Sequence, residues 1–251
     1  MYCVLSPAKK IAKVPTVLPG ATESLLLDQT ALLAECMKAL SSTELQQLMG
    51  ISPALAELNR QRFLAYTHDH HDQSSAGLAI FQFEGDVYRH FNASTLSQDE
   101  LYYTNKTIGI LSGFYGLLRP MDLMQPYRLE MGTSLVTHRG KGLYRFWGNR
   151  VTECIQSLLG SNDLVLNLAS EEYAKVVDWT CLDHWTVAFK EQRGEGLKTV
   201  GVNAKRARGA MARWVVDHRP KTVNDLRDAT PYGYHYHSHD SENRMILFIK
   251  S

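Results

Sequence analysis

Four cysteines stand far apart in this 251-residue chain, and no two of them form a CxxC pair. This scatter excludes a zinc ribbon and a disulfide framework, and it predicts reduced thiols in a cytoplasmic protein. The N-terminus lacks the charged and then apolar layout of a secretory leader, and no apolar run approaches the length of a membrane span. We therefore expect a cytoplasmic protein that has no membrane partner.

An excess of one charge is also missing, because 27 Lys and Arg residues face 26 Asp and Glu residues. The net charge of +1 gives the whole chain no attraction to nucleic acid, so any polyanion site must be a local patch. The hydrophobic content of 44% is ordinary for a soluble protein. No repeat or low-complexity linker divides the chain, which predicts a single domain over residues 1–251.

Enzyme motifs are absent as well. The sequence contains no Walker A loop, no HExxH zinc motif and no GxSxG motif around Ser112. Gly140-Lys141-Gly142 is too short to be a phosphate loop. No cofactor follows from these residues, and an enzymatic activity is neither indicated nor excluded.

Apolar periodicity, caps and turn residues predict an α/β fold of the mixed α+β kind, with helices flanking a mixed sheet. The expected strands are 2–5, 78–83, 164–168, 187–189, 198–202 and 245–249, with a hairpin turn at 193–196. The expected helices are 23–40, the two helices of a hairpin at 41–64, one from the capping box at 97–100 through 108, 143–159, 204–218 and a short one from 222. Residues 67–75 are expected to form a polar loop.

Residues 41–64 predict two helices joined by a glycine turn. A Ser-x-x-Glu capping box begins at Ser41, Gly50 permits a positive φ, and Ser52 and Pro53 suit the start of the second helix. The unpaired N-terminal amides of that second helix would point outward beside Gly50. Such a helix end favours a bound anion.

This segment resembles the helix-hairpin-helix element of DNA-repair proteins, in which hairpin amides hold backbone phosphates without reading bases. Ser52 stands where that element usually has a second glycine. The DNA-binding hypothesis assigns phosphate contacts to Gly50, Ile51 and Ser52. Its basic cleft comprises the cations Lys9, Arg119, Arg128, Lys175, Lys205, Arg206, Arg208 and Arg213. The alternative is an ordinary helical hairpin whose turn only packs.

Positive charge gathers around the helix expected at 204–218. Residues 198–221 contain seven Lys or Arg and one Asp, so the local charge is 7 − 1 = +6. Helical spacing places Lys205, Arg206 and Arg213 on the solvent side and Arg208 at its border. Gly209 and Ala212 lie among them and would keep the surface low enough for phosphates to approach. The alternative is a solvated basic face.

The run 111–132 combines two prolines and two arginines with mainly apolar residues, which predicts a folded loop within the core. Buried Arg119 and Arg128 need partners, and Asp122 and Glu130 are the nearest candidates. These residues form either a structural salt-bridge network or the floor of a pocket for an anionic group.

The chain resembles the bacterial YaaA family of peroxide stress proteins over nearly its whole length. The matching segments are Ser6-Pro7-Ala8-Lys9, Gly85-Asp86-Val87-Tyr88, 111–132, Tyr144 with Phe146-Trp147-Gly148, 167–173 and 204–209. The resemblance implies a cytoplasmic protein that limits oxidative damage when peroxide meets intracellular iron. It also implies DNA binding through a helix-hairpin-helix and a basic cleft, on an α/β fold peculiar to the family.

One polar set could converge on a single site. It comprises Lys9, Tyr88, Arg119, Tyr127, Arg128, Glu130, Asn167, Glu171, Lys175 and Lys205. A second hypothesis is therefore an enzyme acting on an anionic small molecule, with Lys9, Tyr88, Glu130 and Glu171 as catalytic candidates. A close Lys9–Glu pair in a deep pocket would favour chemistry, whereas an open basic groove continuous with Gly50 would favour duplex DNA.

Metal binding is a third hypothesis. His235, His237 and His239 alternate with other residues, so a regular strand would place all three imidazoles on one side. An exposed tail without a fixed fourth ligand is the simpler interpretation. We therefore expect no metal site.

Overall fold

A mixed sheet forms the centre of the computed structural model, which describes residues 1–12, 16–68 and 75–251. Five of its strands are parallel. In spatial order they are β14 (Met245–Lys250), β11 (His184–Arg193), β10 (Val165–Asn167), β1 (Tyr2–Leu5) and β5 (Ile108–Ser112). Three antiparallel strands join them: β13 (His235–Asp240) on β14, β6 (Gly116–Leu118) on β5 and β12 (Gly196–Lys198) on β11. The predicted mixed α/β fold is confirmed.

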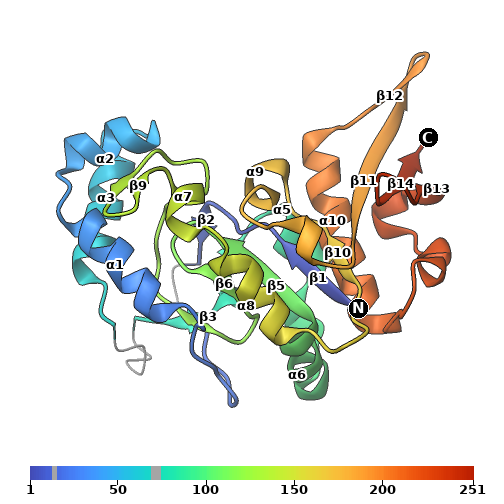
Figure 1. The fold of residues 1–251 in the computed structure, drawn as a ribbon, viewed down its shortest axis with the longest axis horizontal. Coiled ribbons are helices and arrows are strands. Elements are labelled where there is room, and N and C mark those ends of the chain that lie inside the picture. Colours follow the sequence, from blue (N-terminus) through green and yellow to red (C-terminus); the bar gives the residue numbers. More distant parts are fainter. Residues whose placement is uncertain (13–15, 69–74) are drawn as a thin grey trace.

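Helices cover both faces of this sheet, as its parallel centre requires. Every residue of β1 is buried. The helix α6 (Gln98–Thr107) contacts β1 and β5, and α10 (Gly201–His218) contacts β11. Figure 1 shows α8 (Arg150–Leu158) in front of the sheet, where it contacts β6.

The remaining elements are short or lie at one end of the molecule. The other helices are α1 (Leu27–Lys38), α2 (Ser42–Met49), α3 (Pro53–Ala65), α4 (Ala79–Gln82), α5 (Asp86–Phe91), α7 (Leu143–Trp147) and α9 (Glu171–Ala174). Short 3-10 turns are η1 (Ala93–Thr95), η2 (Trp179–Cys181), η3 (Asn224–Asp228) and η4 (Pro231–Gly233). Two-residue strands pair as β2 (Lys10–Ile11) with β4 (Phe83–Glu84), β3 (Gly77–Leu78) with β7 (Leu123–Met124), and β8 (Val136–Thr137) with β9 (Gly140–Lys141). None of the helices in the described ranges is long and apolar enough to span a membrane.

Local signals in the sequence place several helix starts correctly. Both predicted capping boxes are present: Ser41 and Ser97 each cap a helix whose third residue is a glutamate. Gly50 ends α2 with φ 60°, and the Ser52 side chain accepts from the Leu55 amide at 3.4 Å at the start of α3. The two helices and their turn are therefore where the sequence put them, and their use as a DNA-binding element stays a prediction.

The strand predicted at 78–83 is wrong, because residues 79–82 form the single helical turn α4. The amides of Ala79 and Ile80 donate to the carbonyls of Asp122 and Pro120, at 2.9 and 3.0 Å. A short apolar run fits a strand and a buried helical turn equally well, and only these distant partners decide between the two.

Other predicted boundaries also shift. The helix predicted over 143–159 is two helices, because Gly148 adopts φ 49° and ψ −130° between α7 and α8. Ile108 begins β5 instead of continuing α6, since it is drawn into parallel pairing beside Cys3. The strand expected at 198–202 ends at Lys198, and α10 begins at Gly201. In the predicted loop 67–75, residues 69–74 lie outside the described residues.

The helix α10 packs closely on α5. A Cβ built on Gly209 would clash with the Val87 carbonyl and lie only 2.8 Å from its carbon atom. Gly209 and Ala212 are both buried. The expectation that these small residues keep an open surface low for phosphates is therefore wrong: they let two helices approach each other.

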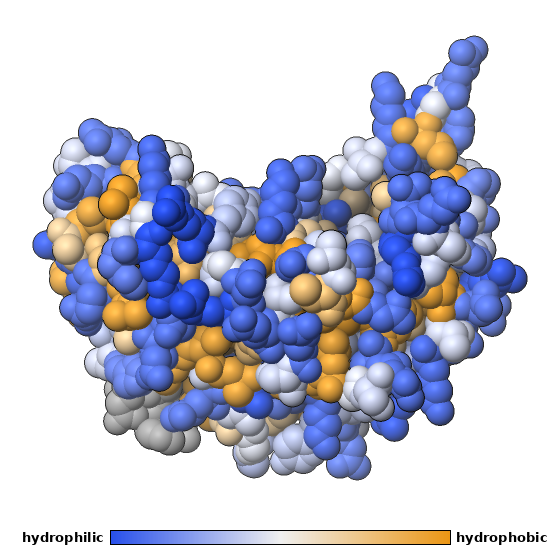
Figure 2. Space-filling model, in the orientation of Figure 1, coloured by the Kyte–Doolittle hydropathy of each residue, from blue (hydrophilic) through white to orange (hydrophobic). Residues whose placement is uncertain are grey.

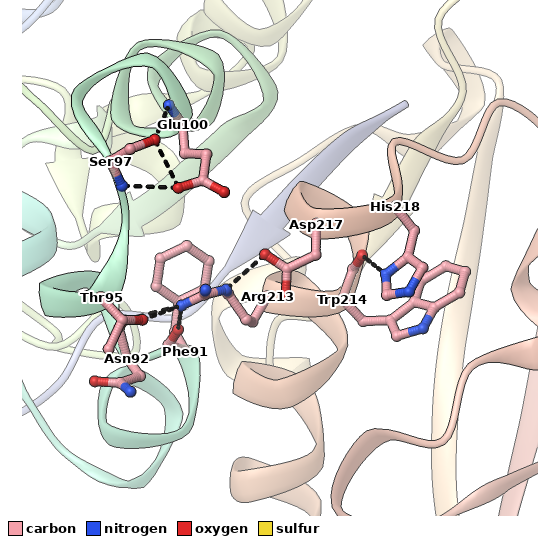
Figure 3. A network of polar contacts seen from close by, with 9 residues as sticks. All are labelled: Phe91, Asn92, Thr95, Ser97, Glu100, Arg213, Trp214, Asp217 and His218. Carbon is pink, nitrogen blue, oxygen red and sulfur yellow. Dashed lines mark hydrogen bonds and ion pairs between the residues drawn. The ribbon is translucent and has the colours of Figure 1, made fainter.

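Hydrogen bonds from Arg213 link α10 to the turn that follows α5 (Figure 3). Its guanidinium donates to the Asn92 carbonyl at 3.1 Å and to the Thr95 hydroxyl at 2.6 Å, and also to Asp217 at 2.7 Å. The side chain is 23% exposed.

Arg206 is held in a similar way, donating to Asp86 at 3.4 Å and to the Tyr232 hydroxyl at 2.8 Å. The prediction that Arg206 and Arg213 face solvent is therefore wrong. Both guanidiniums are engaged within the fold.

Replacing Gly209 with alanine should destabilise the protein by about 1–3 kcal/mol, because the new methyl group forces α10 away from α5. Gly201→Ala is the matched control in the same helix, since no atom lies within 4 Å of a Cβ built there. Thermal or urea unfolding of both variants measures the difference. Equal stability of the two variants would contradict the close packing.

Replacing Arg213 with alanine should cost about 2–3 kcal/mol, because several charge-assisted hydrogen bonds to the fold are lost together. Lys205→Ala is the control, an exposed cation on the same helix, and should change stability by less than about 0.5 kcal/mol. Urea unfolding compares the two. A wild-type midpoint for Arg213→Ala would mean that the network contributes nothing.

Candidate functional site

A cavity lies at the point where the chain direction across the sheet reverses. The chain leaves β1 toward β5 on one side, and it leaves the neighbouring β10 toward β11 on the other. Because β1 and β10 are parallel, the loops at their carboxyl ends meet at the same edge. Open α/β sheets bind their ligands in such a crevice.

The cavity has a volume of about 610 Å³ and is called the crevice below. Its walls come from the loop after β1, the start of α5, the segment 127–130, the loop after β10 and one face of α10. Figure 2 shows the upper outline of the molecule hollowed between its two ends, in the region where Figure 1 places β2 and α9. The charged and tyrosine residues of its lining are Lys9, Lys10, Glu84, Asp86, Tyr88, Tyr127, Arg128, Glu130, Glu171, Glu172, Tyr173, Lys205 and Arg208.

Glu130 is shared by two cations in the crevice. Lys9 Nζ lies 3.1 Å and an Arg128 nitrogen 3.2 Å from the same oxygen, Oε1 of Glu130. The predicted partnership of Arg128 with Glu130 is therefore confirmed. A close Lys9–Glu pair is one part of the arrangement expected to favour chemistry. The Lys9 side chain is 67% exposed, so this pair does not lie deep in a pocket.

The other carboxylates of the crevice already have partners. Glu84 pairs with Lys10, Asp86 with Arg206, and Glu171 with Lys175 at 2.9 Å. Glu172 accepts from the backbone amide of Gly132 at 3.0 Å. The hydrogen bond from Lys175 lowers the pKa of Glu171, so this carboxylate is held in its charged form.

Two cations on α10 complete the crevice without a carboxylate partner. Lys205 is exposed, and Arg208 is half-buried. The Nε atom of Arg208 is shielded from solvent and has no hydrogen-bond partner among the described residues. Burial lowers the pKa of Arg208, because its charged guanidinium has lost part of its hydration.

Three buried tyrosines give the crevice an apolar floor. Tyr88 donates to the Ser6 carbonyl at 2.8 Å, and the Tyr127 hydroxyl lies 2.6 Å from that of Ser112. Burial raises the pKa values of Tyr88, Tyr127 and Tyr173. Tyr88 therefore remains a neutral hydroxyl whose proton is already used, which disfavours it as the catalytic base among the predicted candidates.

Several predicted site residues lie elsewhere. Arg119 binds Asp122 at 2.8 Å in the core, as predicted, but neither residue lines the crevice. Asn167 donates to Thr186 at 3.2 Å and is likewise absent from the lining. The lining also contains neither Lys175 nor the turn 50–52, so the helical hairpin and the crevice are separate features.

The three histidines near the C-terminus do not form a cluster. A β-bulge between Tyr236 and Ser238 breaks the alternation along β13 that the metal hypothesis required. His239 contacts the Tyr236 hydroxyl instead, at 2.5 Å. Over the part of the chain that the structure describes, no three His, Cys, Asp or Glu side chains are placed to hold a metal ion.

The sequence interpretation missed a segment without acidic residues. Residues 131–152 contain four Lys or Arg and no Asp or Glu, and this composition could have been read from the sequence. The cations are Arg139, Lys141, Arg145 and Arg150. None of them pairs with a carboxylate in the described structure.

The strand β8 of this acid-free segment and the hairpin helix α3 both contact the helix α1. An Arg139 nitrogen donates to Gln29 of α1 at 2.6 Å. Lys141 and Arg145 are exposed. Figure 2 shows strongly hydrophilic side chains gathered over the region of α7 and β9.

Comparisons with known proteins agree on one family. The family described as peroxide stress protein YaaA matches residues 1–240. A UPF0246 protein of Legionella pneumophila (strain Lens) is 38% identical over 255 residues, which span 100% of this chain and 99% of the relative. A UPF0246 protein of Bordetella petrii is 40% identical over 253 residues, 99% of this chain and 98% of the relative. The chain thus belongs to the YaaA family of peroxide stress proteins.

Proposed function

We propose that this protein binds DNA through its phosphates, without reading base sequence, as its part in the peroxide stress response. The observation that carries this proposal is that the helical hairpin and the acid-free segment 131–152 both contact one helix, α1. Phosphate contacts fix a protein on DNA and carry no sequence information.

The hairpin supplies a turn that a phosphate can approach. No atom of the described residues lies within 4 Å of a Cβ built on Gly50, so this turn has open space above it. Pro53 and Ala54 are exposed at the start of α3. The first amides and the positive dipole end of this 13-residue helix favour an anion there.

The acid-free segment supplies the charge that the hairpin lacks. The two helices 42–49 and 53–65 contain two arginines against two glutamates, so they carry no net charge. The four cations of residues 131–152 have no acidic neighbour in the segment to offset them. Duplex DNA carries one negative charge per about 1.7 Å of its axis, so a row of such cations is what it requires.

The crevice itself does not suit a duplex. Its lining contains five Lys or Arg and five Asp or Glu, so its net charge is 5 − 5 = 0. A phosphate backbone entering it would meet these carboxylates. The contacts with duplex DNA therefore fall to the hairpin and the acid-free segment, instead of the basic cleft that included Lys9, Arg128 and the α10 arginines.

Lys141→Ala combined with Arg145→Ala should weaken duplex binding for every sequence alike and lower the salt slope by roughly two, one for each lost phosphate contact. Fluorescence titration of a labelled duplex at several salt concentrations measures both quantities. The melting temperature should stay near that of the wild type, because both side chains are exposed.

The matched control is Lys106→Ala with Lys198→Ala, which removes two exposed cations outside the segment. It should keep the wild-type salt slope. If the control and the test variant lose affinity equally, only total charge matters and the proposed surface is wrong. A wild type that fails to bind duplex at low salt would end the proposal.

Gly50→Ala should reduce DNA affinity and destabilise the fold by about 1–2 kcal/mol, since a side chain at this positive φ is strained. Gly196→Ala, at the open start of β12 and without a positive φ, should change neither quantity. Affinity is compared at a temperature where each variant is fully folded. If the folded Gly50→Ala variant binds DNA with the affinity of the wild type, the hairpin has only a packing role.

A further inference from the structure

Two cations in the crevice have no carboxylate partner among the described residues. Each of its five carboxylates has a partner: a cation for four of them and a backbone amide for Glu172. Among the lining cations, Lys9, Lys10 and Arg128 pair with Glu84 or Glu130. Lys205 and Arg208 have no carboxylate in the described structure.

The environment of the Arg208 side chain is energetically unfavourable in the protein without a ligand. A guanidinium that loses water without gaining a partner raises the energy of the fold. On the same helix, the Arg206 guanidinium has polar partners in place of water, with hydrogen bonds to Asp86 and Tyr232. The Nε atom of Arg128, which also lines the crevice, is likewise shielded and has no hydrogen-bond partner among the described residues.

We propose that the crevice binds a phosphate monoester, with its phosphate group against Arg208 and Lys205 and its body over the tyrosine floor. A phosphate monoester carries about −1.5 to −2 charges at pH 7, which matches the two unpaired cations. A carboxylate or a phosphodiester carries a single charge and leaves one cation unpaired. The planar guanidinium of Arg208 also presents parallel donors to phosphate oxygens.

The dimensions favour a small ligand. The volume of about 610 Å³ falls within the range of small-molecule sites, roughly 300–1,000 Å³. The side chains of Tyr88, Tyr127 and Tyr173 give its body an apolar surface. The monoester has two possible sources, a free nucleotide or the phosphorylated end of a DNA strand, and both present the same chemical group.

Calorimetric titration of the full chain at constant ionic strength tests the proposal. Adenosine 5′-monophosphate is the monoester probe, its 3′,5′-cyclic form is the diester control, and adenosine is the uncharged control. The monoester should bind at least tenfold more tightly than the cyclic diester. Equal binding of the two nucleotides, or no binding of the monoester at millimolar concentration, would overturn the proposal.

Arg208→Met should weaken monoester binding at least tenfold while its melting temperature stays at or above that of the wild type, because a half-buried charge without a partner is removed. Arg213→Met is the matched control, because Arg213 lies on the same helix and none of its partners lines the crevice: it should melt lower and bind the monoester as the wild type does. Lys205→Met should also weaken monoester binding. Because Lys205 is exposed, this variant should fold, and it tests the site even if Arg208→Met does not fold. Wild-type affinity in Arg208→Met and Lys205→Met would contradict the assignment.

Oligonucleotides with and without a 5′-phosphate identify the source of the monoester. Tighter binding of the phosphorylated strand than of the free nucleotide supports a DNA end, and the reverse supports a small molecule. The variant that lacks Lys141 and Arg145 should bind the free nucleotide normally. Loss of duplex binding and loss of the monoester site are therefore distinguishable.

Discussion

The close contact of α10 with α5 is the constraint on which the rest of this structure depends. The absence of a side chain at Gly209 lets the backbone of α10 lie against the Val87 carbonyl. This approach brings Arg206 within reach of Asp86 and Arg213 within reach of the turn after α5. With α10 held in this position, Lys205 and Arg208 line the crevice at the carboxyl ends of β1 and β10.

Two binding surfaces with different electrostatics follow from this architecture. The segment 131–152 contains no acidic residue of its own and exposes Lys141 and Arg145, which suits a long polyanion. The crevice balances most of its charges internally and, within the part of the chain that the structure describes, leaves only Lys205 and Arg208 without a carboxylate partner, which suits a compact dianion. Net charge conceals this difference, because the crevice residues cancel one another and the chain total is only +1.

The sequence predicted features that depend on neighbouring residues and failed where distant partners decide. Ser41, Gly50 and Ser97 set helix ends through their own side chains or backbone freedom, and each was placed correctly. Residues 79–82 become helical because of the segment 120–122, which no local pattern reveals. Among the site residues, Lys9, Arg128 and Glu130 converge as expected. Arg206 and Arg213 do not join that site. The apolar periodicity of α10 places them on its solvent side, but it cannot show that α5 and η4 pack against that side.

Both the crevice and its proposed ligand depend on the guanidinium of Arg208, which side-chain NMR of ¹⁵N-arginine-labelled protein observes directly. The Nε–H signal of Arg208, assigned as the one missing from Arg208→Met, reports on its hydrogen bonding. We expect this signal to shift, and the shift to saturate, when a phosphate monoester is added, while the Arg206 signal stays in place. A signal that does not respond to the monoester would mean that Arg208 does not bind the phosphate.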